Sequence, residues 1–291
     1  MMPTDPNDPT LVAAPTLPPP PPPSPGRGPA LVAPSPGVRM AWLLVGSIAA
    51  FVGLAFGTVQ AVGLVAHEEH TEVATIADPA VAVLDVASDG GRIEVVGADV
   101  SSVRITAHIS DGLVPTRFEH TVVGDRLEVR VRCRAVITGP WCRAGLRIVV
   151  PRDLEVKVHS DDDHISLRGL TGRVEAQASN GSIEAEGLSG AVLLRSSNGA
   201  VRGTRLRTPS IQASSDNGSV RLEFESPPRS TIADSDNGAV EVALPRGTQG
   251  YDVDISSDNG GTDNLVRTDS TSDHRVVASS NNGSVTVRYV D

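Results

Sequence analysis

Aspartates within a recurring polar turn are the residues of this sequence with the clearest potential for chemistry. If the turns stack, their carboxylates could line up along one edge, and a calcium ion needs several oxygen ligands of this kind. The sequence nevertheless lacks the glycine-rich nonapeptide of calcium-binding β-rolls. Tight Asn-Gly turns explain the same recurring residues without a metal. We predict no metal and no cofactor, with calcium binding as the alternative. The aspartates are Asp161, Asp162, Asp163, Asp216, Asp236 and Asp258.

An enzyme that acts on carbohydrate would need two carboxylates with different roles and a cleft lined for sugars. The sequence is poor in the side chains that stack on sugar rings, since aromatic residues make up 3% of it. No Ser-His-Asp constellation can be assigned, because Ser and Asp are so abundant that chance matches are common. We therefore predict that the chain is not an enzyme and has no catalytic residue.

The two cysteines, Cys133 and Cys142, lie close together in the segment RCRAVITGPWC. A Gly-Pro turn between them could fold two short strands back on each other. We predict a disulfide between them, which requires an oxidising compartment. A metal site would need two further ligands of suitable spacing, and none is nearby. Two free thiols are the alternative.

The polar turn recurs about every twenty residues in the second half of the chain. It reads SNGSI, SNGAV, SDNGSV, SDNGAV, SDNGG and NNGSV, after an earlier DDDHI. Asn and Gly tolerate the left-handed backbone conformation that a tight corner needs, and stacked Ser, Asp and Asn side chains can hydrogen-bond from one turn to the next. The predicted turn residues are Asn180, Gly181, Asn198, Gly199, Asn217, Gly218, Asn237, Gly238, Asn259, Gly260, Asn282 and Gly283.

Apolar residues alternate on both sides of each turn, as in Val220, Leu222 and Phe224 after one turn and Ile211 and Ala213 before it. Alternation of this kind indicates strands with one buried face. No two-strand repeat can bury that face alone, so stacking successive repeats into a β-solenoid is the physical solution. We predict an all-β, solenoid-like stack. An antiparallel meander of hairpins is the alternative, because Asn-Gly is also a strong hairpin signal.

The chain before the repeats divides into further segments. Residues 78–158 predict strands without the regular turn, and we assign them to the same domain, 78–291, as a cap on the first repeat. Residues 67–77 are expected to form a short stalk. Residues 1–39 contain the run TLPPPPPPSPGRGP, whose prolines favour an extended conformation without a packed core. They are predicted to be a disordered tail.

Residues 40–66 contain no charged residue, and about 20 apolar residues suffice to cross a bilayer as a helix. We predict one transmembrane helix there. A cleaved signal peptide is the alternative, although its apolar region is normally shorter. Arg27 and Arg39 precede the segment, whereas Glu68 and Glu69 follow it, so the N-terminus is predicted to be cytoplasmic and the repeat domain extracytoplasmic at the plasma membrane.

The formal net charge is -10, and the excess negative charge falls in residues 67–291. Duplex nucleic acid is polyanionic and would be repelled by such a domain. We predict no nucleic-acid partner.

The repeat pattern resembles the bacterial putative-adhesin family, a domain of unknown function built of β-strand repeats and often found behind a membrane anchor. The segments that carry the resemblance are LRIVVPRDLEVKVHSDDDHISLRGL, VEAQASNGSIEAEGL, SIQASSDNGSVRLEF and TIADSDNGAVEVALP, and it covers residues 78–291. The resemblance implies a cell-envelope location and roles in adhesion or envelope-stress signalling. It supplies no catalytic residues.

Together these observations predict a non-enzymatic, single-pass membrane protein that displays a β-solenoid as a binding or structural module. Its partner would be an envelope protein or a glycan. The alternative is a transmembrane signalling component that acts through the cytoplasmic tail, and a carbohydrate-processing enzyme is a third hypothesis.

Overall fold

The computed structural model describes residues 45–54, 68–111, 116–132, 143–247 and 250–290. The chain divides into two compact units, Met1–Gly57 and Thr58–Asp291. In the first unit residues 45–54 are helical. Within the described residues no helix combines the length and the hydropathy needed to cross a bilayer. The tail at 1–39 and the rest of the predicted span lie outside the described residues.

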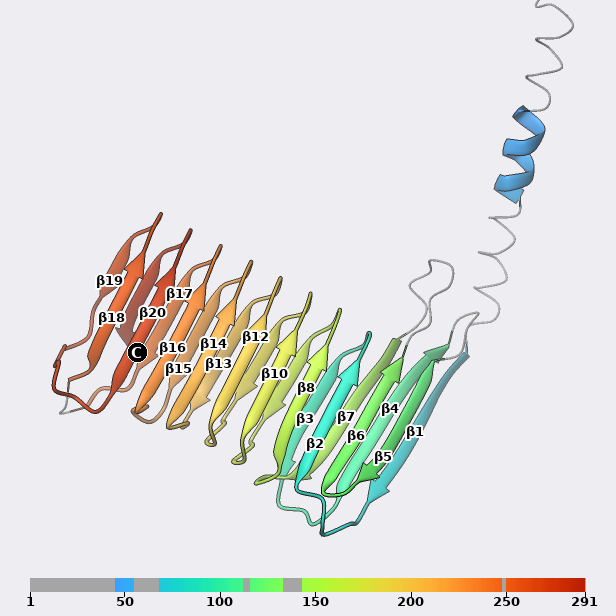
Figure 1. Ribbon diagram of the computed structural model, residues 1–291, viewed down its shortest axis with the longest axis horizontal. Helices are drawn as coiled ribbons and strands as arrows, with labels where there is room; N and C mark the ends of the chain where they lie inside the picture. The colour runs from blue at the N-terminus through green and yellow to red at the C-terminus, as the bar shows by residue number, and fades with distance from the viewer. Residues whose placement is uncertain (1–44, 55–67, 112–115, 133–142, 248–249, 291) are drawn as a thin grey trace, which may run out of the picture. The chain divides into compact units, whose positions relative to one another are not determined.

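The second unit consists of two large β-sheets (Figure 1). Sheet A has 11 strands, in the spatial order β1 (Glu68–Ile76), β4 (Val103–Asp111), β7 (Arg143–Pro151), β3 (Ile93–Ala98), β9 (Ile165–Arg168), β11 (Ile183–Glu186), β13 (Val201–Leu206), β15 (Val220–Phe224), β17 (Val240–Leu244), β21 (Val285–Tyr289) and β19 (Thr262–Asn264). Sheet B has 10 strands, in the order β18 (Asp252–Ser257), β20 (Arg275–Ser280), β16 (Ser230–Ser235), β14 (Ser210–Ser215), β12 (Val192–Ser196), β10 (Val174–Ala178), β8 (Glu155–Ser160), β2 (Val83–Ser88), β6 (Arg126–Arg132) and β5 (Arg117–Val123).

The chain alternates between the sheets, and most neighbouring strands are parallel. Each repeat contributes one strand to sheet B and the next strand to sheet A, and we call such a pair a coil. Strand β12, for example, pairs in parallel with β10 on one side and with β14 on the other. Consecutive strands of a hairpin meander would instead pair with each other in antiparallel fashion. The hairpin alternative is therefore wrong for the repeats.

The core is a thin layer between the two sheets. The alternating residues of β14 and β15 point into it, and Ile211, Ala213, Val220, Leu222 and Phe224 are all at most 1% exposed. Because the layer is only two side chains thick, aliphatic residues fill it, which accounts for a folded domain with few aromatic residues. The predicted period-two alternation is confirmed.

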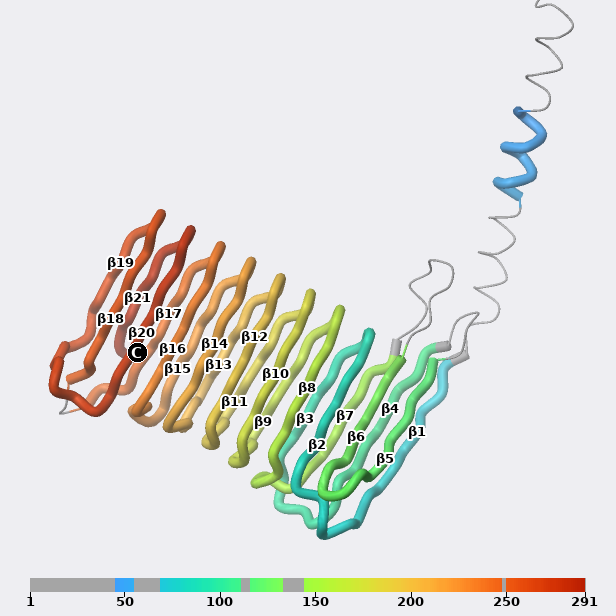
Figure 2. The backbone as a smooth tube through the Cα atoms, viewed as in Figure 1, coloured from blue at the N-terminus to red at the C-terminus, as the bar shows by residue number. Residues whose placement is uncertain are grey.

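The coils do not stack strictly in chain order, contrary to the sequence-based prediction. Strand β20 lies between β16 and β18, and β21 lies between β17 and β19. The last coil is thus inserted between the two coils that precede it in the sequence, and the coil β18–β19 is outermost (Figure 2). The connection between β19 and β20 brings the chain back, and Val266 within it is 8% exposed.

The N-terminal part of the domain combines one more displaced coil with antiparallel strands. The coil β2–β3 lies between β6–β7 and β8–β9, although β6 and β7 follow it in the sequence. Strand β4 pairs in antiparallel fashion with β7 and with β1, and β5 does so with β6. The expected stalk at 67–77 is therefore wrong over β1, because Ala74 and Ile76 of that strand pack against the core.

The turn glycines are needed for a reason that differs from the prediction. None of the described turn Asn or Gly residues has a positive φ. The left-handed residues Gly169, Gly187 and Arg205 instead lie in register with one another at the far end of their sheet A strands. A Cβ on Gly218 would lie less than 3.0 Å from the carbonyl oxygen of Gly199, the equivalent glycine of the next coil. Close stacking of the coils, not backbone conformation, excludes any side chain there.

The same close approach repeats along the stack. A Cβ on each glycine would meet the carbonyl oxygen of the neighbouring turn residue, in the pairs Gly181 on Asp163, Gly199 on Gly181, Gly218 on Gly199, Gly238 on Gly218, Gly283 on Gly238 and Gly260 on Gly283.

We expect Gly218→Ala to lower the free energy of unfolding by about 3 kcal/mol, because overpacking against backbone forces the coils apart. Urea unfolding of the purified protein followed by circular dichroism measures the change. Gly261→Ala is the matched control, since a Cβ there meets nothing within 4 Å, and it should change stability by less than about 0.5 kcal/mol. Equal effects of the two substitutions would contradict this account of the turn.

Candidate functional site

Two surfaces of the stack carry the ordered polar groups of the domain. The first is the turn edge, formed by the stacked Asn-Gly turns that join the sheet B strand of a repeat to the following sheet A strand. The second is the charged face, the outer surface of sheet A. Cys133 and Cys142 lie outside the described residues, so the disulfide stays a prediction.

The turn asparagines form one continuous hydrogen-bonded ladder. Each side-chain Nδ2 donates to the side-chain oxygen of the equivalent residue in the adjacent coil. The bonds run from Asn180 to Asp162 (2.9 Å), Asn198 to Asn180 (2.8 Å), Asn217 to Asn198 (2.8 Å), Asn237 to Asn217 (3.0 Å), Asn282 to Asn237 (2.9 Å) and Asn259 to Asn282 (3.0 Å). The structure thus brings all the predicted turn asparagines together.

In most of the Asn-Gly turns, a serine three residues before the turn glycine locks the turn to its neighbour. Ser215 Oγ donates to the carbonyl oxygen of Gly199 at 2.8 Å and accepts from the N–H of Gly218 at 2.9 Å. Ser196 makes the same pair of bonds, to Gly181 and Gly199, both at 2.9 Å. The sequence-based interpretation did not single out these serines. Their constant spacing before Asn-Gly was the signal that could have found them.

The aspartates do not form the aligned row that the calcium alternative requires. By register, the column containing Asp216 and Asp236 continues with Asn281 on one side and Ser197 on the other. Asp236 Oδ1 accepts from Asn281 Nδ2 at 3.0 Å, and Asp162 accepts from the asparagine ladder. Across the described ranges, no three His, Cys, Asp or Glu side chains form a group that could hold a metal. Several of these carboxylates act as acceptors within the turn edge.

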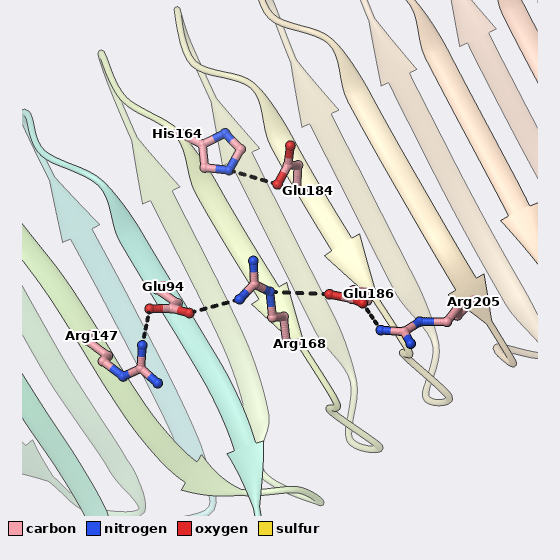
Figure 3. A network of polar contacts seen from close by, with 7 residues as sticks. All are labelled: Glu94, Arg147, His164, Arg168, Glu184, Glu186 and Arg205. Atoms are coloured by element: carbon pink, nitrogen blue, oxygen red, sulfur yellow. Dashed lines mark hydrogen bonds and ion pairs between the residues drawn. The ribbon is translucent and has the colours of Figure 1, made fainter.

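The charged face is organised by ion pairs between neighbouring coils (Figure 3). Glu94 of β3 accepts from Arg147 of β7 at 2.7 Å and from Arg168 of β9 at 3.2 Å. Arg168 continues to Glu186 of β11 at 3.3 Å, and Glu186 also pairs with Arg205. Exposed pairs of this kind contribute about 0–1 kcal/mol each, so the network orders the surface more than it stabilises the fold.

A second group of ion pairs lies further along the same face. Glu241 of β17 accepts from Arg221 Nε at 2.6 Å and from Arg288 Nε at 2.8 Å. The hydrogen bond from Arg221 is the main cause that lowers the pKa of Glu241, burial opposes it, and Arg288 adds to the lowering. The carboxylate therefore stays charged in the folded protein to a lower pH than in the unfolded chain.

A pocket of about 300 Å³ opens among the loops at the N-terminal end of the stack. Asp78, Ser101, Ser102 and Asp153 supply polar groups to its lining. Asp78 Oδ1 accepts from the N–H of Ala80 at 2.9 Å, which closes its own loop. This carboxylate therefore has a local structural role.

Comparisons with known proteins do not assign the chain to a family. No protein-family profile matches it, and no curated protein matches it. Three solved bacterial structures align with 77% of the chain: a putative cell adhesion protein of Clostridium sporogenes (11% identity, TM-score 0.39, 100% of that chain), a putative adhesin of Bacteroides fragilis (13%, 0.41, 97%) and a putative adhesin of Parabacteroides merdae (12%, 0.34, 97%). A likeness this low carries no argument about function.

We expect Ser215→Ala to lower the free energy of unfolding by about 1–2 kcal/mol, because it removes the hydrogen-bond partner of two partly buried backbone groups. The smaller side chain fits, since Ala178 occupies the equivalent position in the coil β10–β11. Urea unfolding measures the loss. The adjacent Ser214 points outward, so Ser214→Ala is the control and should be near neutral; a comparable loss there would count against the serine column.

We expect Glu241→Gln to flatten the pH dependence of stability in acid. Because the folded pKa of Glu241 lies below its ordinary value of 4.5, its stabilising contribution is present above about pH 4.5 and disappears as the pH falls through the folded pKa. The variant should be less stable at pH 7 and lose less stability on acidification. Urea unfolding at pH 7 and pH 3 tests this, with Glu223→Gln as control; parallel pH profiles for wild type and Glu241→Gln would refute it.

Proposed function

We propose that residues 68–290 form a β-solenoid that acts as a non-enzymatic binding or structural module of the cell envelope. The observation that carries this proposal is the unbroken turn edge, in which asparagine and glycine contacts join every coil of the repeat region to its neighbour and serine contacts reinforce most of these junctions. Such a stack holds outward-facing side chains at a fixed spacing over an extended surface. An extended, regular surface suits recognition of an extended partner.

The uncharged segment 40–66 supports attachment of this module to the plasma membrane as a single-pass protein. In this arrangement the Pro-rich tail is cytoplasmic and the coils face the exterior, where a disulfide between Cys133 and Cys142 can form. The partner is an envelope protein or a glycan. The acidic balance of the domain disfavours nucleic acid.

Signalling through the tail is the second candidate function. The run TLPPPPPPSPGRGP favours it, because extended proline-rich segments are recognised by aromatic-lined grooves of other domains. In that case the module would sense the envelope and the tail would report its state. The two functions differ in which end of the chain is indispensable.

We expect deletion of residues 1–38 to leave capture of envelope components unchanged, since the module alone makes the contacts. Tagged full-length protein is used for pull-downs from detergent-solubilised envelope, with calcium and with chelator, and bound material is identified by mass spectrometry and glycan analysis. The double variant Gly218→Ala, Gly238→Ala disrupts the stack and should lose capture. Capture that depends on the tail, and not on the stack, would favour the signalling function.

A further inference from the structure

A shallow pocket of about 120 Å³ lies on the charged face between β9, β11 and β13. Three of its lining residues, Arg168, Glu184 and Glu186, belong to the ion pairs drawn in Figure 3. Hydroxyl, carboxylate and guanidinium groups all converge on it. Its polar lining residues are Ser166, Arg168, Glu184, Glu186, Arg202 and Thr204.

Ser166 is a buried hydroxyl without a partner in this pocket. Its register neighbours in the adjacent coils are Glu94 and Glu184, so its side chain belongs to the outer face of sheet A. Ser166 is nevertheless only 4% exposed, and its Oγ has no hydrogen-bond partner among the described residues. A buried polar group left unpaired destabilises the structure, because it loses its hydrogen bonds to water without replacement. A ligand atom that reaches this hydroxyl would supply the missing hydrogen-bond partner.

Arg202 is an arginine of the pocket that does not take part in the ion-pair network. In register it lies between Glu184 of β11 and Arg221 of β15. Arg168, Arg205 and Arg221 on the same face all pair with carboxylates, whereas no salt bridge involves the exposed Arg202 within the described part of the chain. Its planar guanidinium therefore has free donors directed to solvent.

Glu184 provides the matching acceptor. His164 Nε2 lies 3.3 Å from Glu184 Oε2, and His164 Nδ1 lies 2.7 Å from Ser182 Oγ, which holds the imidazole in place. One carboxylate oxygen of Glu184 is thus engaged and the other is left to accept from a ligand. An acceptor group therefore lies on the coil next to the buried hydroxyl, and a donor group lies on the coil beyond it.

This combination selects the chemistry of the ligand. The polar lining disfavours an apolar molecule, the nearby carboxylates disfavour a simple anion, and the arginines disfavour a cation. Vicinal hydroxyls of a sugar both donate and accept, so they satisfy a carboxylate, a guanidinium and a serine at once. We propose that the pocket is a subsite for a sugar ring of an envelope carbohydrate, with Arg202, Glu184 and Ser166 as its direct contacts. The subsite gives a ligand class to the binding module proposed above and rests on that function.

The test is titration of the full-length protein with defined oligosaccharides, namely chitotetraose, maltotetraose and tetragalacturonate, by isothermal calorimetry and ligand-observed NMR. Saturable binding of at least one of them is expected. Arg202→Ala should weaken that binding about tenfold or more, as the loss of a hydrogen bond from a charged group implies. Ser166→Ala should weaken it severalfold without lowering stability, because the hydroxyl it removes is unpartnered.

Arg195→Ala is the matched control, because Arg195 is an exposed arginine on β12 of the opposite sheet, and it should leave affinity unchanged. Equal weakening by Arg195→Ala and Arg202→Ala, or no saturable binding of any of the sugars, overturns the subsite. If the pull-down still captures an envelope component while no sugar binds, the subsite fails and the binding module stands. Absence of both overturns both.

Discussion

The stacking of each turn glycine on the carbonyl of its neighbour is the contact on which the rest of the structure depends. Adjacent strands lie about 4.8 Å apart, and at the turn this spacing leaves no room for a Cβ. Once the glycines are in contact, Ser215 and its equivalents can bridge a carbonyl of one coil and an N–H of the next. The asparagine amides then meet at 2.8–3.0 Å along the outside of the same edge. One packing constraint thus aligns both hydrogen-bonded columns.

Because the coils with Asn-Gly turns offer nearly the same edge, they are interchangeable partners. This explains how β20–β21 can lie between two coils that precede it in the sequence without any loss of turn contacts: Asn282 and Ser280 bond to Asn237 and Gly238 as a consecutive coil would. The same uniformity would invite further strands to add at the ends. Acidic residues there, Glu69 and Glu72 on β1 and Asp252 and Asp254 on β18, discourage that pairing.

The ion pairs of the charged face also follow the repeat, but their pattern is interrupted at one place. Outward positions of neighbouring coils pair arginine with glutamate, so these charges neutralise one another locally. Around Ser166 and Arg202 this pattern fails, and a buried hydroxyl and an available guanidinium lie next to a partly engaged carboxylate. The regular scaffold holds this irregular polar site in a fixed geometry, which suits the binding function proposed above.

The sequence by itself determined the local features: two strands in each repeat, the buried positions of Val220 and Leu222, and the asparagines that stack at the turns. These follow from side-chain alternation and turn chemistry within a few residues. Only the tertiary structure decided which coils are neighbours, that Gly218 is needed for close approach and not for a left-handed backbone, and that Glu94 meets Arg168. Those facts depend on contacts between distant segments, and coils with identical edges leave no local signal of the order in which they stack.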